Sequence, residues 1–329
     1  LEELRLSHLV ITTPEMLSSN LRRLSAKTVP LIDAGVLVID EIQLLADEHR
    51  GHHLEAGLID YTNYNPYSRL VFLSATAPNV GELSLFQNSL NSKKSKIVCS
   101  TYRAVPLDIN FIPYNCGYSM GESYDDRIVE QLLLLDEFPD DVWLIFVHSK
   151  AFGRRLERRL LEEGYPCEFH NADIDFNKRK ELEQRFRNGD IKRLISTKTL
   201  AWGCNTPARR VSVLGISAGG KKVPVYDLQQ MVGRAGRPGQ HFKGDAYIFY
   251  PSGEAHEEIL LRAKLAMGEE IKSTLCNRDS LSFHLVAQIY IGRVLSTEEA
   301  EEWYNKTFAA IQGQGAPLGG IIGVVSYLE

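Results

Sequence analysis

VLVIDEIQLL, residues 36–45, is a short apolar run that ends in two carboxylates, Asp40 and Glu41. Near-continuous β-branched runs of this kind are typical of parallel strands covered on both faces. Open α/β sheets bind their ligands beyond the carboxyl ends of such strands. One carboxylate there can hold Mg²⁺ through its water shell, and its neighbour can orient or deprotonate an attacking water. The stretch therefore predicts an α/β sheet with a nucleotide-hydrolysing edge, although an isolated Asp-Glu pair more often only ends a strand.

Further apolar runs of strand length recur on both sides of this stretch. They lie at 8–12, 69–74 and 96–100 in the first part of the chain, and at 142–147, 193–197, 211–216 and 245–250 in the second. The segments between the later runs carry apolar residues at helical spacing, with charged residues on their other faces. We therefore expect two parallel α/β sheets in succession.

Composition divides the chain into four segments. Residues 1–105 would form the first α/β domain, 106–124 a connector with a little strand, 125–252 the second α/β domain and 253–329 a helical domain. The connector is rich in Pro, Gly, Tyr and Ser. The last segment holds three helical patterns followed by GGIIGVVSYLE, which is compatible with a small β-hairpin. This pattern favours a winged-helix module.

Bulk properties narrow the class of protein. A chain of 329 residues with 44% hydrophobic residues can bury two or three cores, and its net charge of −5 requires any nucleic acid to be held by local basic clusters. Five scattered cysteines without a C-x-x-C pair argue against a zinc site or a disulfide framework. No apolar run approaches the roughly 20 residues needed to cross a bilayer. We expect a soluble protein of the cytoplasm or nucleus.

Arginine pairs and hydroxyls supply further phosphate-binding chemistry. QQMVGRAGRPG at 229–239 places Arg234 and Arg237 three residues apart, which suits the charge on a transferring phosphoryl group. LSATAP ends another apolar run with the hydroxyls of Ser74 and Thr76. TTPEML opens a helix whose first amide groups can bind a phosphate. Alone, the arginine motif is suggestive, LSATAP is common as a turn, and TTPEML is more often just a helix start.

Taken together, TPE, DEIQ, SAT, HSK, TLAWGCNTPA and QQMVGRAGRPG resemble the superfamily two DExH-box helicases, most closely the superkiller-like branch. YRAVPL and HNAD also match, so the resemblance covers about residues 5–310. It implies two RecA-like domains, the first incomplete, followed by a mainly helical winged-helix domain. It also implies an ATP-dependent helicase that moves 3′ to 5′ on a single strand.

The resemblance assigns residues to the ATP site. Asp40 would hold Mg²⁺ through water and Glu41 would activate the hydrolytic water, with Gln43 in place of the branch's usual His. Ser74 and Thr76 would couple hydrolysis to strand movement. The second domain would contribute Gln230, Arg234 and Arg237, with Arg237 as the arginine finger, and Gly203 and Asn205 would sense closure of the cleft.

The resemblance also assigns a nucleic-acid track. It would run over Thr13, Pro14 and Glu15 in the first domain and over His148, Ser149, His170, Thr197 and Thr199 in the second. Hydroxyls, amides and imidazoles suit phosphate contacts that do not read bases. Arg209 and Arg210 would add electrostatic grip, unless they belong to a solvated face. We expect a strand-separating hairpin within SAGGKKVPVYD, residues 217–227.

The chain departs from the family pattern because it contains no G-x-x-x-x-G-K-[ST] loop. We expect that loop to lie upstream of this chain, which would then be inactive on its own. The alternative is a non-catalytic nucleic-acid clamp with a degenerate helicase fold. Within the enzyme class, DNA is favoured over RNA by the likeness to repair helicases, and an RNA remodeller of the same branch stays open.

The tract EHRGHH holds three histidines, His49, His52 and His53. It lacks the H-E-x-x-H spacing of metalloprotease zinc sites and adjoins an expected helix start. We therefore predict a solvated or phosphate-facing role for these side chains and no structural metal.

Overall fold

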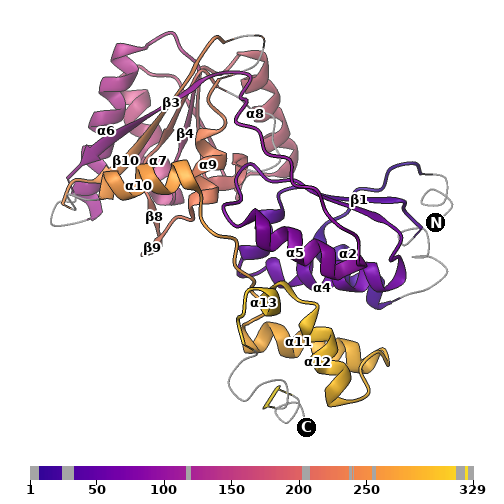
Figure 1. The fold of residues 1–329 in the computed structure, drawn as a ribbon. Coiled ribbons are helices and arrows are strands. Elements are labelled where there is room, and N and C mark those ends of the chain that lie inside the picture. Colours follow the sequence, from indigo (N-terminus) through magenta and orange to yellow (C-terminus); the bar gives the residue numbers. More distant parts are fainter. Residues whose placement is uncertain are drawn as a thin grey trace. The chain divides into compact units, whose positions relative to one another are not determined.

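The computed structural model describes residues 7–23, 33–115, 120–201, 208–236, 239, 241–253, 257–315 and 323–324. The chain forms two compact units, one of Leu1–Cys99 with Glu269–Glu329 and the other of Ser100–Gly268. Both contain parallel strands with helices against them, so the fold is α/β with a helical C-terminal region (Figure 1). None of the described helices is long and apolar enough to cross a membrane.

The first unit is built on two short parallel strands. β1 (Val36–Ile39) pairs with β2 (Arg69–Phe72), and Val36 lies opposite Arg69. The connection between them runs through the 3-10 helix η1 (Ile42–Ala46) and α4 (Gly51–Tyr64), and α5 (Val80–Asn91) follows β2. A further helix, α2 (Pro14–Arg22), packs against α4.

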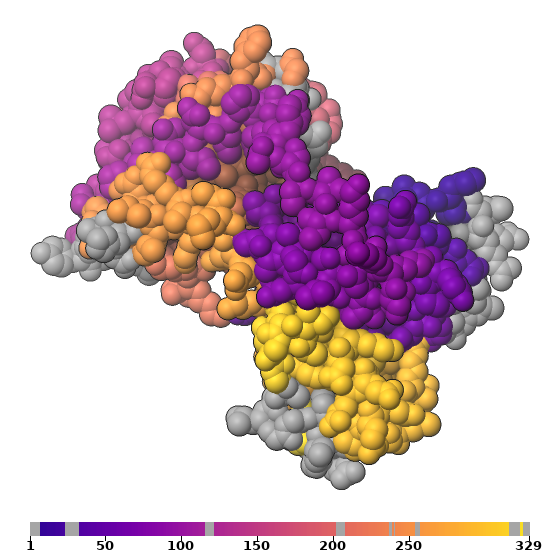
Figure 2. Space-filling model, viewed as in Figure 1, coloured from indigo at the N-terminus to yellow at the C-terminus, as the bar shows by residue number. Residues whose placement is uncertain are grey.

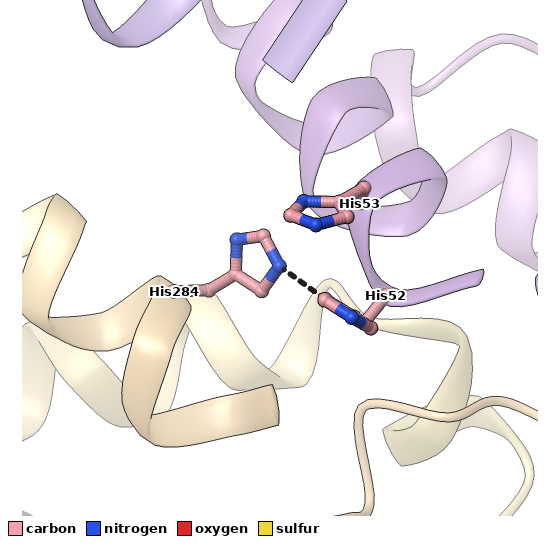
Figure 3. Close-up of side chains that lie close together, drawn as sticks. All are labelled: His52, His53 and His284. Atoms are coloured by element: carbon pink, nitrogen blue, oxygen red, sulfur yellow. Dashed lines mark hydrogen bonds between the residues drawn. The ribbon is translucent and has the colours of Figure 1, made fainter. Parts of the chain in front are cut away.

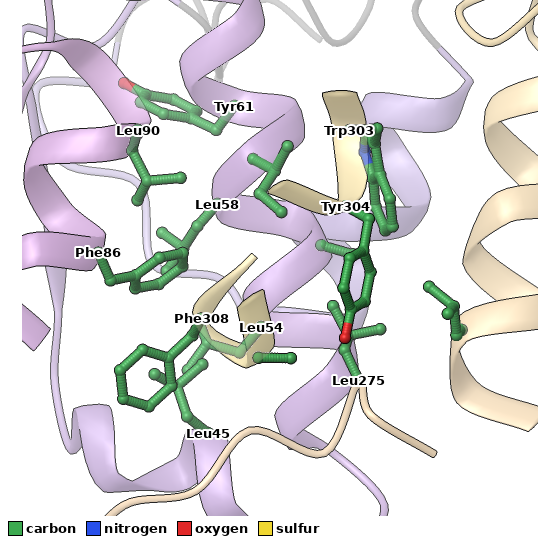
Figure 4. Packing of buried hydrophobic residues seen from close by; sticks show 14 of the residues in the cluster. Leu45, Leu54, Leu58, Tyr61, Phe86, Leu90, Leu275, Trp303, Tyr304 and Phe308 are labelled. Carbon is green, nitrogen blue, oxygen red and sulfur yellow. The ribbon is translucent and has the colours of Figure 1, made fainter. Parts of the chain in front are cut away.

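Helix α4 is the centre of the first unit because residues 54–62 are all buried, so every face of the helix is covered. Leu54, Leu58 and Tyr61 join Phe86 of α5 in one apolar core (Figure 4). Burying each such side chain contributes about 1.5–3 kcal/mol. The start of α4 also lies close to η1, since a Cβ on Gly51 would come within 2.1 Å of the Leu45 carbonyl oxygen.

The C-terminal helices share this core. They are α11 (Arg278–Tyr290), α12 (Thr297–Asn305) and α13 (Phe308–Ile311). Trp303 and Phe308 belong to the same apolar cluster as α4, and the C-terminal helices lie directly against the first segment in Figure 2. Buried polar groups fix their position: Asp60 Oδ1 accepts hydrogen bonds from Gln288 Nε2 at 2.9 Å and from Arg293 Nη1 at 2.7 Å.

Two predicted strands of the first unit, at 8–12 and 96–100, are not strands in the structure. Both are extended segments with exposed apolar side chains, of which Ile11 is 88% and Val98 82% exposed. A strand exists only through its hydrogen-bonded neighbour, and within the described ranges neither segment has one. Val36 and Val38 on β1 are also half exposed, so the expected burial of this sheet on both faces is wrong for β1.

The second unit holds a six-stranded, all-parallel sheet. Its strands are β3 (Leu107–Tyr114), β4 (Trp143–Phe146), β5 (Glu168–His170), β6 (Arg193–Ser196), β7 (Arg210–Val213) and β10 (Gly244–Pro251), in the order β3-β10-β7-β4-β6-β5. Its helices are α6 (Met120–Glu137), α7 (Lys150–Glu162), α8 (Phe176–Asn188), α9 (Val225–Val232) and α10 (Glu257–Met267). Leu144 and Phe146 enter the core on one face, while Trp143 and Ile145 enter the core on the other.

The four strands predicted in this unit are confirmed. The structure adds β5, which is too short for a visible pattern. The little strand expected in the connector is β3, an eight-residue strand at the edge of this sheet. The predicted hairpin is also present: β8 (Ser217–Ala218) pairs antiparallel with β9 (Lys221–Lys222). Gly219 and Gly220 have φ of 58° and 81°, as a two-residue type I′ turn requires.

The boundaries of the predicted domains and the winged helix stay predictions. The segment at 319–329 that suggested the wing lies outside the described residues except for 323–324.

A buried carboxyl group ties α4 to the C-terminal helices and predicts a pH effect. Glu55 Oε1 accepts from the amides of Phe308 and Ala309, at 2.7 and 3.3 Å, and Oε2 accepts from Ser273 Oγ at 2.6 Å. Burial nevertheless raises the pKa of Glu55 to about 7. Because the folded pKa is the higher one, this group's stabilising effect is complete below about pH 4.5 and is lost as pH rises through about 7.

We expect Glu55→Gln to flatten this dependence, because the amide does not titrate, its oxygen can still accept from the Phe308 and Ala309 amides, and its NH2 group can donate to Ser273 Oγ. Between pH 5 and 8 the wild-type free energy of unfolding should fall by on the order of 2–3 kcal/mol more than that of the variant. Chemical denaturation across this pH range measures it, with the exposed Glu302→Gln as control. Parallel pH profiles for wild type and Glu55→Gln would contradict the assignment.

Candidate functional site

The acidic motif lies where β1 ends. Asp40 is exposed, and Glu41 has φ 56° and ψ 55°, a left-handed backbone. This conformation costs a residue with a Cβ roughly 1 kcal/mol or more and is concentrated at functional sites. It turns the chain from strand into η1, where the Ile42 amide donates to the Leu73 carbonyl at 2.8 Å. The acidic motif is thereby fastened to the end of β2.

A side-chain bridge joins the acidic motif to the hydroxyl motif. Gln43 is buried, and its Nε2 donates to Glu41 Oε2 while its Oε1 lies 2.8 Å from Ser74 Oγ. Ser74 Oγ lies equally close, at 2.8 Å, to the carbonyl oxygen of Thr76. A hydroxyl has one proton, so Ser74 donates to one of these acceptors at a time. The structure therefore brings together Glu41, Gln43 and Ser74.

The predicted helix start at TPE is confirmed. Pro14 begins α2, and the Thr13 hydroxyl caps it by accepting from the Met16 amide at 3.3 Å. Glu15 forms an ion pair with Arg50, with 2.6 Å between Oε1 and Nε. The hydrogen bond from Arg50 is the main reason that the pKa of Glu15 falls to about 2. Glu15 is therefore a fixed anion at the start of this helix.

In the second unit, polar side chains line the carboxyl ends of neighbouring strands. His148 and Ser149 follow β4, His170 ends β5, and Thr197 follows β6. His170 Nδ1 lies 3.0 Å from Thr199 Oγ1, and the Thr197 amide donates to the His170 carbonyl at 3.2 Å. The structure brings these predicted residues together at one edge of the sheet.

The two histidines of this edge are held by protein groups. His148 Nε2 lies 2.6 Å from the Gly215 carbonyl oxygen, and His170 Nε2 lies 3.3 Å from Glu183 Oε1. Burial lowers the pKa of both imidazoles. His170 is only 1% exposed, so it positions Thr199 rather than presenting a surface of its own.

The arginine motif leaves the end of α9. Arg234 Nη2 donates to the Ala201 carbonyl at 2.7 Å, so this side chain reaches the TLAWG segment. Gly236 has φ 81°, and a Cβ there would lie 2.6 Å from Val105 Cγ1, so the second glycine of the motif is required by space and by backbone. Gln230 lies on α9. Arg237, Gly203 and Asn205 lie outside the described residues.

Sequence reasoning missed one residue that shapes this motif. Arg103 Nη2 donates to the carbonyls of Gly233 and Ala235, at 3.2 and 3.1 Å, and its Nε donates to the Val105 carbonyl. It therefore holds the loop that carries Arg234. The segment YRAVPL contributes to the family resemblance, but no local sequence pattern links Arg103 to a loop 130 residues away.

Arg209 and Arg210 are not brought together with the other predicted nucleic-acid residues. They lie at the amino end of β7, the opposite end of the strands from His148. Both donate to Asp245 Oδ2, at 2.7 and 2.9 Å, and Arg210 also donates to Asp141 Oδ2 at 2.6 Å. Arg210 is buried. This placement counts against the predicted grip on nucleic acid, because internal carboxylates already neutralise both charges.

Two parallel α/β units, one with a carboxylate pair beyond a strand and one with an arginine loop after a helix, define a RecA-like class of nucleotide-binding protein. Residues 1–83 match the family described as DEAD/DEAH box helicase, and residues 126–239 match the helicase conserved C-terminal domain. The chain therefore belongs to the superfamily two DExH-box helicases, in the superkiller-like branch.

Curated relatives extend this likeness. The chain is 30% identical over 310 residues to the ATP-dependent DNA helicase Hel308 of Thermoplasma volcanium, covering 84% of this chain and 44% of that protein. It is 28% identical to activating signal cointegrator 1 complex subunit 3 of Dictyostelium discoideum, over 96% of this chain and 16% of that protein. It is also 28% identical to the DExH-box ATP-dependent RNA helicase DExH13 of Arabidopsis thaliana, over 94% of this chain and 16% of that protein. The chain spans less than half the length of each of these relatives.

The bridge between the motifs predicts an energetic coupling. Gln43→Ala and Ser74→Ala each remove one partner of the same hydrogen bond, so their effects on unfolding free energy should differ from additivity by about 1 kcal/mol. A double-mutant cycle by chemical denaturation measures this coupling. Gln43→Ala combined with Ser89→Ala is the control, because Ser89 Oγ donates to the Phe86 carbonyl and, among the described residues, has no hydrogen bond with Gln43. Additivity in both cycles would show that Gln43 and Ser74 are not coupled energetically, which would contradict a stabilising bridge.

Proposed function

We propose that this chain is part of an ATP-dependent DNA helicase that moves along a strand in the 3′ to 5′ direction, and that it contributes residues that act in nucleotide hydrolysis. The hydrogen-bonded bridge from Glu41 through Gln43 to Ser74 carries the proposal. It joins a carboxylate suited to activating water to the end of a neighbouring strand, which is what coupling of hydrolysis to movement needs. The Hel308 relatives, named as DNA helicases, support DNA as the substrate.

The described acidic residues fit a magnesium nucleotide. Asp40 is an exposed carboxylate at the carboxyl end of a parallel strand, and Mg²⁺ is commonly held there by one or two carboxylates and water. Bound Mg²⁺ would neutralise charge on the phosphates. Glu41 orients and deprotonates the attacking water, and Gln43 fixes its carboxylate. We assign Gln230, Arg234 and Arg237 to the phosphates.

Hydroxyls and helix amides fit a sequence-independent grip on the strand. Thr13 with the start of α2, Ser149 with the start of α7 (Lys150–Glu162), and Thr197 with Thr199 offer groups that suit phosphate oxygens. His170 holds Thr199 in place for this contact. Because these groups contact phosphates and not base edges, we expect the proposed enzyme to bind strands independently of their nucleotide sequence.

We further propose that the 329 residues do not hydrolyse ATP by themselves, because they contain no G-x-x-x-x-G-K-[ST] loop. In a form extended to include such a loop, strand-stimulated ATP hydrolysis should fall roughly 100-fold or more in Glu41→Gln and roughly 1,000-fold in Arg237→Ala. Steady-state hydrolysis assays measure both losses.

The matched controls are Glu48→Gln and Arg158→Ala, which change exposed residues of the same types and should keep wild-type turnover. Equal turnover in wild type, Glu41→Gln and Arg237→Ala would overturn the mechanism. Strand binding without any hydrolysis in the extended form would instead establish a non-catalytic clamp.

The hairpin of β8 and β9 fits a strand-separating role, since its tip carries two glycines followed by the exposed residues Lys221 and Lys222. Deleting residues 218–221 should lower unwinding of a DNA duplex at least about tenfold, or roughly 1.4 kcal/mol of barrier, while strand-stimulated ATP hydrolysis persists. Matched DNA and RNA duplexes test this in the extended form. Wild-type unwinding by the deletion variant would rule out the hairpin's role, and faster RNA unwinding would favour an RNA remodeller.

A further inference from the structure

Three imidazoles that are distant in the sequence cluster in the first unit. His52 and His53 come from α4 and His284 from α11, and one ring nitrogen of each lies within 4.8 Å of the others (Figure 3). His52 Nδ1 and His284 Nε2 are 2.9 Å apart. The centroid of the His53 ring lies 4.2 Å from that of His52 and 5.4 Å from that of His284. Adjacent helix residues normally diverge, so the closeness of the first two rings is specific to this place.

The apolar core holds the backbones that carry these rings. Leu54 follows His53 and Leu285 follows His284, and both leucines are buried in the same cluster. His284 itself is 1% exposed. The positions of α4 and α11 are therefore fixed independently of the histidines, and the site does not depend on a flexible loop.

One ring nitrogen of the cluster lacks a hydrogen bond. His52 and His284 satisfy one nitrogen each through their mutual contact, but His53 Nδ1 is buried without a partner in the described parts of the chain. An unsatisfied buried polar atom costs about 1–3 kcal/mol. A ligand that accepts the lone pair of this nitrogen would offset that cost.

The charge state suits a metal ligand set. Burial is the largest cause that lowers the pKa of all three imidazoles, that of His284 to about 2. An imidazole of ordinary pKa, about 6.5, is already mostly neutral at pH 7, and the neutral form is the one that binds metal ions.

The charged neighbours of the cluster act in both directions. Arg22 opposes a cation at all three rings. A hydrogen bond with the His49 backbone favours positive charge at His52 more than the His49 ring opposes it, and Glu15 favours positive charge at His53. The Arg22 guanidinium is held back over the Phe283 ring, 5.0 Å from its centroid, and donates to Ser18. A bound metal ion would therefore be repelled by the Arg22 guanidinium, which Ser18 and the Phe283 ring already hold in place.

We propose that His52, His53 and His284 form a binding site for a divalent transition metal ion of the zinc type. Imidazole nitrogens select such ions over Mg²⁺ and Ca²⁺. Zinc-to-nitrogen distances of about 2.0–2.1 Å place tetrahedral ligands roughly 3.3 Å apart, so His53 would close in by at most about 1.5 Å and the contact between His52 and His284 would open slightly. Water takes the fourth position.

Such an ion would fasten α11 to α4 across 232 residues of sequence. From the sequence, the tract around His49 predicted no structural metal. In the structure His49 is exposed and lies outside the cluster, and the third histidine of the cluster is His284 from α11. The proposal is independent of ATP hydrolysis.

Titration of the whole 329-residue chain with Co²⁺ and Zn²⁺ tests the site, in a Cys99→Ser background that removes the one exposed thiol of the described residues. We expect one Co²⁺ per chain with the visible absorption of a tetrahedral complex and no thiolate charge-transfer band. Zn²⁺ should displace it and raise the melting temperature. His284→Ala and His53→Ala should each weaken binding by more than about 100-fold, because losing even an outer-shell partner costs roughly 10- to 100-fold.

The matched control is His49→Ala, which should bind both ions as the wild type does. Because His53 is only partly buried, its variant stays informative if His284→Ala fails to fold, as circular dichroism would show. The proposal is overturned if the wild type binds no ion at this stoichiometry. It is equally overturned if His49→Ala loses as much affinity as His53→Ala.

Discussion

The burial of α4 on every face is the constraint on which the first unit depends. The start of α4 contacts η1, so the position of α4 determines where the acidic motif lies. The other sides receive α5 and the C-terminal helices in a single core. A helix that is enclosed in this way cannot rotate without exposing apolar surface, so it holds the acidic motif and the C-terminal segment in one register.

Buried polar groups make that register specific. Glu55 and Asp60 are costly to bury, and in the described parts of the chain the hydrogen bonds to Glu55 and to Asp60 Oδ1 come from residues beyond 269, while Asp60 Oδ2 has no partner there. Apolar surfaces tolerate sliding, whereas a carboxylate surrounded by particular donors does not. Glu55 and Asp60 therefore select one position of the C-terminal helices among the positions that apolar packing alone would allow.

Local chemistry could be predicted from the sequence because it lies directly after recognisable strands. The positions of Asp40, Glu41 and Ser74 follow from apolar runs and need no tertiary information, and the Gly219-Gly220 turn is equally local. The partners of Glu55, and the contact of His284 with His52, depend on pairings over more than 200 residues, for which one sequence carries no pattern. The runs at 8–12 and 96–100 misled because β propensity describes a residue and not its neighbour.

Ser74 has a consequence of a different kind. Its single proton has two acceptors at equal distance, one on the side chain of Gln43 and one on the backbone beside Thr76. Turning that proton from one acceptor to the other is a binary choice that moves no heavy atom. Rotations of this size are complete within picoseconds to nanoseconds. The hydrogen-bonded junction between Glu41 and the end of β2 can therefore rearrange within that time when the Glu41 side chain changes its position or charge.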